Sequence, residues 1–138
     1  MTVIVTDTGF GTDDWANGFF TLDELPANHP PALAVDLPSD AEPDDLQDLL
    51  ENIDMIRVDF PSFADGRGFT IARRLRLMGF TGRLRAKGHV IADQYAMARR
   101  SGFDEVEIDG ALAERQPEDQ WQFRSNWKDH DYQSRLRA

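Results

Sequence analysis

The sequence predicts an α/β domain built around a parallel sheet, and three observations lead to this prediction. Strand-like and helix-like segments alternate over residues 32–110. The joints between them are short, which favours a parallel βαβαβαβ unit with right-handed crossovers. Charged and apolar residues alternate along the strands, which places the helices mainly on one face of the sheet.

The chain of 138 residues suits a single domain with its own core. Residues 1–31 are expected to be an N-terminal arm with a hairpin, because one short β-like run precedes a proline-rich loop. Residues 32–110 hold the βα core, and residues 111–138 are expected to be a C-terminal helix and tail. Four aromatic side chains are expected to anchor that tail on the domain: Trp121, Phe123, Trp127 and Tyr132.

Within the core, the first strand is expected at 32–37, followed by a helix over 38–53. Ser39 and Glu42 match a capping box, and Pro43 suits the first turn of that helix. Apolar periodicity and closing glycines then predict, in order, a strand at 55–60, a helix at 68–78 ended by Gly79, a strand at 82–88, a helix at 89–102 and a strand at 103–109.

The strands of the core are not the continuous apolar runs expected of strands covered on both faces. One face is apolar, and the other carries charges of both signs: Arg57, Asp59, Arg83, Arg85, Lys87, Glu105, Glu107 and Asp109. The basic strand between acidic ones permits ion pairs across strands.

Two architectures explain the charged strand face. In one, the sheet curls like half of a βα barrel and the charged face lines a concave interior. In the other, the sheet is open, and the N-terminal arm, the C-terminal tail or another subunit covers the charged face. A homo-oligomer is compatible with both.

Composition excludes several classes of function. The chain has no cysteine, which excludes disulfides, thiolate catalysis and an iron–sulfur cluster ligated by this chain. The histidines are scattered and no nucleotide-binding glycine motif follows a strand, so no metal and no cofactor are predicted. The net charge of −10 argues against nucleic acid as a partner. No apolar run is long enough to span a membrane and no signal peptide is evident, so a cytoplasmic protein is expected.

The charge is distributed unevenly along the chain. Residues 61–100 hold nine basic and two acidic groups, a balance of +7, while the other 98 residues hold six basic and 23 acidic groups, a balance of −17. This asymmetry indicates either an anion site or arginines that pair with acidic surface elsewhere.

The candidate site lies where ligands bind in parallel α/β folds, in the loops at the carboxyl ends of the strands. The first loop is Asp65-Gly66-Arg67-Gly68. Its glycines permit a positive φ or close approach of a ligand, Arg67 can clamp an oxyanion with two parallel hydrogen bonds, and Asp65 could cap the following helix or orient Arg67. The alternative is that this segment is only a tight turn.

A second loop adds Arg85, Lys87 and His89 to the candidate anion or substrate site. His89 could act as an acid–base group, a hydrogen-bond donor or a helix cap. Asp93 and Gln94 follow on the next helix and are candidates for pairing with Arg85. No residue of either loop is identified as catalytic.

Residues 56–108 resemble a known bacterial family. The segments DFPSFADGRGFTIARRLR, GRLRAKGHVIADQ and RRSGFDEVEI carry the resemblance, with matching positions from Phe60 to Asp104. This uncharacterised family is encoded beside sulfite reductase and adenylyl-sulfate reductase genes, and it carries the label of an oxidoreductase involved in sulfite reduction. Two positions depart from its pattern: Arg83 stands where an acidic residue is usual, and Ser101 where a cysteine is frequent.

The resemblance implies an accessory protein of assimilatory sulfite reduction. Such a protein would bind an oxyanion, or dock on sulfite reductase or another sulfur-assimilation protein, through the surface of Arg67 and Arg85. Two alternatives stay open. One is an enzyme acting on a small metabolite, with Asp65, Arg67, Arg85 and Asp93 as acid–base groups and anion clamp. The other is a non-catalytic interaction module.

Overall fold

A computed structural model describes residues 2–25 and 32–127, and within them the chain forms one open α/β sheet. The strands are β1 (Thr2–Thr6), β2 (Gly9–Gly11), β3 (Phe20–Thr21), β4 (Ala34–Leu37), β5 (Met55–Phe60), β6 (Arg83–Gly88) and β7 (Glu105–Asp109). The α-helices are α1 (Arg67–Leu77), α2 (Tyr95–Ser101), α3 (Gly110–Arg115) and α4 (Glu118–Gln122). Four 3-10 helices complete the described elements: η1 (Leu22–Glu24), η2 (Pro43–Leu46), η3 (Leu50–Asn52) and η4 (Ala92–Gln94).

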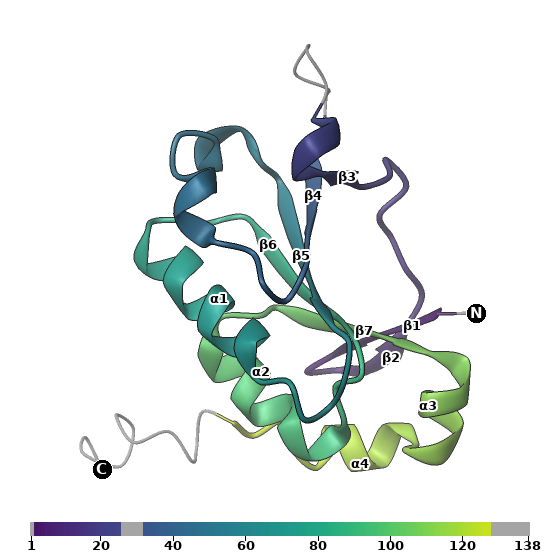
Figure 1. Ribbon diagram of the computed structural model, residues 1–138. Helices are drawn as coiled ribbons and strands as arrows, with labels where there is room; N and C mark the ends of the chain where they lie inside the picture. The colour runs from purple at the N-terminus through teal and green to yellow at the C-terminus, as the bar shows by residue number, and fades with distance from the viewer. Residues whose placement is uncertain (1, 26–31, 128–138) are drawn as a thin grey trace.

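The sheet order confirms the predicted α/β class. The strands lie in the order β2-β1-β7-β6-β5-β4-β3, and β3 to β7 run parallel in chain order. Helices α1 and α2 cover one face, whereas the segment between β2 and β3 crosses the other (Figure 1). The sheet does not close, so the open-sheet alternative is correct and the half-barrel is not.

The N-terminal segment is more than an arm laid over a core that starts at residue 32. The expected hairpin is present, since β1 pairs antiparallel with β2. However, β1 also pairs antiparallel with β7, and β3 pairs parallel with β4. The first 25 residues therefore add strands to both edges of the sheet.

The core lies between the sheet and the two helices. Apolar residues of β5, β6 and β7 alternate as predicted, and Ile56, Val58, Leu84 and Val106 are fully buried. Leu75 of α1 is buried against them in the same cluster. Each such side chain contributes about 1.5–3 kcal/mol relative to an exposed one.

The helix predicted over 38–53 is wrong. Two short 3-10 helices, η2 and η3, occupy this segment. The expected capping box does not form, because Ser39 accepts a hydrogen bond from Arg67 and Glu42 pairs with Arg74. Leu46 is buried as expected, so the apolar pattern was sufficient to predict burial but not helix type.

The later elements follow the prediction closely. Helix α1 and strand β5 match within a residue, and Gly79 and Gly102 end α1 and α2 with positive φ. The predicted helix at 89–102 is shorter, comprising η4 and α2. No helix among the described residues combines the length and apolar composition that crossing a membrane requires.

The C-terminal segment packs back on the domain through Trp121. This side chain is buried and its indole N–H donates to the carbonyl of Gln116 at 2.9 Å. Trp127 lies over Arg99, whereas Phe123 is exposed. The prediction of an anchoring aromatic cluster is thus met by Trp121 and Trp127 and not by Phe123, and Tyr132 lies outside the described residues.

Candidate functional site

The charged face of the sheet carries a buried ion-pair network, as the strand alternation predicted. Arg57 on β5 binds Asp36 on β4 through two hydrogen bonds, of 2.6 and 2.8 Å, and reaches Glu107 on β7 at 3.1 Å. Arg85 on β6 donates from Nε to Glu105 at 2.6 Å and from Nη1 to Glu107 at 2.9 Å. The side chain of Arg85 is 0% exposed.

Residues 12–19, here called the strap, seal this network from above. Asp13 accepts a hydrogen bond from Arg85 Nη2 at 3.1 Å, and Asp14 accepts one from Arg83 at 2.8 Å. Phe19 lies over the Arg57 guanidinium, 3.5 Å from it to the ring centroid, which is a cation–π arrangement. Among the alternatives for covering the charged face, the structure supports the N-terminal segment.

The environment of Arg85 makes it a structural cation. Burial opposes its charge, but hydrogen bonds and charge from Asp13, Glu105 and Glu107 outweigh burial and raise the pKa of Arg85. All three guanidinium nitrogens are engaged with carboxylates. Because the Arg85 side chain is 0% exposed, it is not accessible to an external oxyanion, and the expectation that it shares a surface with Arg67 is wrong.

The loop at Asp65-Gly66-Arg67-Gly68 is held by its own side chains. Arg67 donates from Nε and Nη2 to the two oxygens of Asp65 at 3.0 and 2.7 Å, and Nη2 also reaches Ser39 Oγ at 2.9 Å. Asp65 additionally accepts from the Arg67 amide at 3.1 Å, the orienting contact at the start of α1. These hydrogen bonds from Arg67 lower the pKa of Asp65.

The glycines of this loop act differently from the prediction. Neither Gly66 nor Gly68 has a positive φ. Gly68 instead lies against the ring of Phe60, where an added Cβ would come within 2.4 Å of the ring. The Arg67 side chain is 59% exposed, but Asp65 already occupies the paired donors that a bidentate anion would need.

Lys87, at the end of β6, differs from every other strand-borne cation in the described part of the chain. Arg57, Arg83 and Arg85 all pair with carboxylates. For Lys87, no hydrogen bond or ion pair with a described residue is found, although it stands in register with Asp59 and Glu107. Among the described strand residues, Lys87 is thus the cation that no carboxylate neutralises.

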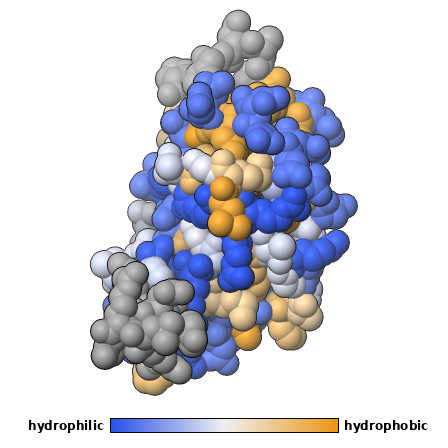
Figure 2. All heavy atoms as spheres, turned by 90° about the vertical axis from the view of Figure 1, so that its left-hand side faces the viewer, coloured by the Kyte–Doolittle hydropathy of each residue, from blue (hydrophilic) through white to orange (hydrophobic). Residues whose placement is uncertain are grey.

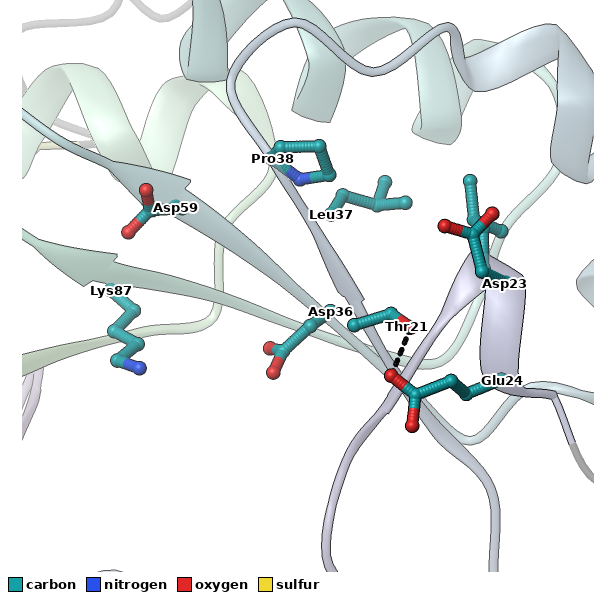
Figure 3. Close-up of a pocket in the computed structure, with 9 residues that line it drawn as sticks. Thr21, Asp23, Glu24, Asp36, Leu37, Pro38, Asp59 and Lys87 are labelled. Carbon is teal, nitrogen blue, oxygen red and sulfur yellow. Dashed lines mark hydrogen bonds between the residues drawn. The ribbon is translucent and has the colours of Figure 1, made fainter.

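A cavity of about 570 Å³ opens beside Lys87 at the ends of β4, β5 and β6. Figure 3 shows the Lys87 side chain extending away from Asp59, on the side of the strands where the Asp36 carboxylate lies. Glu24 reaches in from η1 and accepts a hydrogen bond from Thr21 at 3.1 Å. The Asp36 carboxylate is neutralised by Arg57, so its presence does not satisfy Lys87.

A smaller cavity of about 180 Å³ lies on the other side of Lys87 and gathers further hydrogen-bond donors beside the carboxylates of Glu107 and Asp109. His89 and Arg115 line it together with Lys87, and Thr2 closes it from β1. His89 is fixed through its backbone, whose N–H donates to the Phe60 carbonyl at 2.9 Å. Lys87 and His89 were predicted for the site, and Arg115 was not. Nothing in the polar sequence after residue 110 indicates that Arg115 lies at the carboxyl edge of the sheet.

Asp93 and Gln94 do not pair with Arg85 as expected. Asp93 forms an ion pair with Arg124. Gln94 accepts from the Ile91 amide at 3.0 Å and donates to the Phe63 carbonyl at 2.8 Å. Gln94 thereby ties the loop before η4 to the loop before α1, which is a positioning role.

The described residues offer no obvious place for a metal ion, since no three His, Cys, Asp or Glu side chains among them gather closely enough. The two cavities at this edge combine the donors Lys87, His89 and Arg115 with carboxylates of the surrounding strands and of η1. Donors of this kind can hold a small anion.

The comparisons with known proteins give one match. Residues 34–138 match the family described as bacterial protein of unknown function (DUF934). No curated protein and no solved structure matches the chain.

Proposed function

We propose that this chain, which belongs to the family of bacterial proteins of unknown function (DUF934), is a cytoplasmic accessory protein of assimilatory sulfite reduction. The proposal is based on the sequence resemblance and on the candidate site. In this role it holds a small oxyanion at Lys87 and docks on sulfite reductase or another sulfur-assimilation protein. The pathway comes from the resemblance over residues 56–108, and the anion site comes from the carboxyl edge of the sheet.

The observation that carries the anion site is the uncommitted charge of Lys87. The arginines on the same face, Arg57, Arg83 and Arg85, all pair with carboxylates. Lys87 lines cavities on both of its sides, and the larger one is also lined by four carboxylates: Asp23, Glu24, Asp36 and Asp59. His89 and Arg115 add donors to the smaller cavity. A small oxyanion with several acceptor oxygens fits such a set of donors.

The Arg67 loop is the second place for an anion, as the sequence suggested. There an incoming oxyanion has to compete with Asp65, whose carboxylate already holds Nε and Nη2 of Arg67. This competition favours Lys87 over Arg67 as the main contact in the proposal.

The enzyme alternative has less support from the geometry. Of its four residues, Asp65 and Arg67 bind each other, Arg85 is sealed beneath the strap, and Asp93 binds Arg124. These groups do not converge on one reacting atom, which general acid–base catalysis requires.

Thermal unfolding with sulfite, sulfate and phosphate tests the anion site. We expect millimolar sulfite to raise the melting temperature of the wild type, since a ligand at a hundredfold excess over its Kd adds about 2.7 kcal/mol to the free energy of unfolding. Lys87→Ala should lose this shift. Arg67→Ala should keep most of it, and Arg73→Ala, on exposed helix surface, serves as the charge-matched control.

Two outcomes of that titration would count against the proposed site. If none of the three anions raises the melting temperature of the wild type, the chain does not bind sulfite, sulfate or phosphate. If the shift disappears in Arg67→Ala and persists in Lys87→Ala, the anion binds at the Arg67 loop instead.

A further inference from the structure

The face formed by α1 and α2 carries an apolar groove that the core does not fill. Its volume is about 530 Å³, and it runs from the loop before α1 along both helices. Three large apolar side chains along it are exposed: Phe63 by 60%, Leu77 by 81% and Met97 by 53%. Figure 2 looks onto this side and shows apolar patches among hydrophilic side chains.

The groove also contains an unmet hydrogen-bonding group. Ser101, at the end of α2, lines the groove and is 2% exposed. Its hydroxyl has no hydrogen-bond partner among the residues that the structure describes. Buried polar groups in native proteins are nearly always paired, so Ser101 is an exception among the described residues, although its hydroxyl lies beneath the surface of the groove.

The rim of the groove is basic although the chain as a whole is acidic. Helix α1 contains four arginines and no acidic residue. Arg74 is neutralised by Glu42 and Asp44, but Arg73 lines the groove without a hydrogen bond or ion pair to any residue within 2–25 and 32–127. The groove thus offers apolar contacts flanked by at least one uncompensated cation.

This charge distribution decides between two kinds of occupant. A second copy docked through a two-fold axis would place the same patch on both sides, so it would bring a second Arg73 into the interface and no acidic residue of the groove lining. Like charges facing each other across an interface are unfavourable. A partner segment with acidic residues beside its apolar ones meets both features of the groove.

We propose that the α1–α2 groove binds an amphipathic helical segment of a partner protein, with apolar anchors in the groove and acidic residues facing Arg73. Anchors spaced along one helical face are the usual way in which a groove between helices is filled. The inference rests on the proposed function, which supplies the partner to be tested. The groove lies on the opposite face of the sheet from the strap.

Binding of purified sulfite reductase from the same bacterium tests this proposal, measured by biolayer interferometry at two salt concentrations. We expect Leu77→Asp to weaken binding about tenfold or more, because it places a charge on an apolar anchor. Arg73→Glu should weaken binding mainly at low salt. Phe123→Asp is the matched control: its side chain is 74% exposed but lies outside the groove.

The outcomes separate failure of the groove from failure of the proposed function. Loss of binding in Leu77→Asp and Arg73→Glu, with Phe123→Asp unchanged, supports the proposal. Equal binding by all variants overturns the groove and leaves the accessory role in place, whereas no binding even by the wild type overturns both. Light scattering completes the test: a dimer that Leu77→Asp dissociates would identify a second copy as the occupant and overturn the proposal.

Discussion

Arg85→Ala is expected to lower the free energy of unfolding by about 3–5 kcal/mol, enough to prevent folding if the domain is only marginally stable. The side chain is fully buried and its three nitrogens meet Asp13, Glu105 and Glu107. Removing the cation leaves buried carboxylates without compensation, which costs far more than losing an exposed pair. Urea unfolding followed by circular dichroism measures the change.

Lys87→Ala provides the matched control for this experiment. Lys87 lies on the same strand and the same face, two residues further on, but it makes no ion pair with the described residues. Its replacement should change the free energy of unfolding by no more than about 0.5 kcal/mol. If Arg85→Ala and Lys87→Ala are equally stable, the buried network is not the structural centre of this face.

Gly68→Ala is expected to lower the free energy of unfolding by about 1–3 kcal/mol, because it overpacks the core. The new Cβ would lie 2.4 to 2.9 Å from three atoms of the Phe60 ring. That ring is itself buried and packs on Phe69 and Phe103 at centroid distances of 4.9 and 5.7 Å, so it has little freedom to move. Chemical denaturation measures the loss.

Gly66→Ala, in the same loop, is the control for Gly68→Ala. The nearest atom to its added Cβ is 3.9 Å away, and its φ of −87° suits any residue. We expect a change within about 0.5 kcal/mol. A large loss in Gly66→Ala, or none in Gly68→Ala, would show that the glycines are there for the loop conformation rather than for packing against Phe60.

The strand alternation was the most informative feature of the sequence. It predicted which side chains of β5, β6 and β7 face the helices and which form ion pairs, because successive side chains on a strand point to opposite faces. It could not distinguish Arg85 from Lys87, which lie on the same face of β6. Their difference comes from the strap, whose Asp13 reaches Arg85 from 72 residues away in the chain.

The segment at 38–53 shows the limit of local signals. The segment has the residue types of a capping box, but no capping box forms. Ser39 instead contacts Arg67, and Glu42 pairs with Arg74. Aspartates at 44, 45 and 48 also disfavour a regular helix, since aspartate has a low helix propensity and like charges four residues apart repel. Leu46 and Leu50 are buried nonetheless. The spacing of apolar residues predicts which side chains are buried, but it does not determine the type of helix that buries them.

The strands of the N-terminal segment were harder to predict because they are short. β2 and β3 have three and two residues, too few for a periodic pattern to be read. Their place at the two sheet edges depends on pairing with β1 and β4. Arg115 was missed for a related reason, since its approach to Lys87 is set by the turn from β7 into α3.

The central claim, that this chain is an accessory of sulfite reduction, is tested most directly by affinity purification from its native bacterium. The tagged chain is purified from cells grown on sulfate as the sole sulfur source, and the bound proteins are quantified against an untagged strain by mass spectrometry. We predict strong enrichment of sulfite reductase or another sulfur-assimilation protein, reduced by Leu77→Asp. Recovery of the chain in good yield with no sulfur-assimilation protein enriched would contradict the claim.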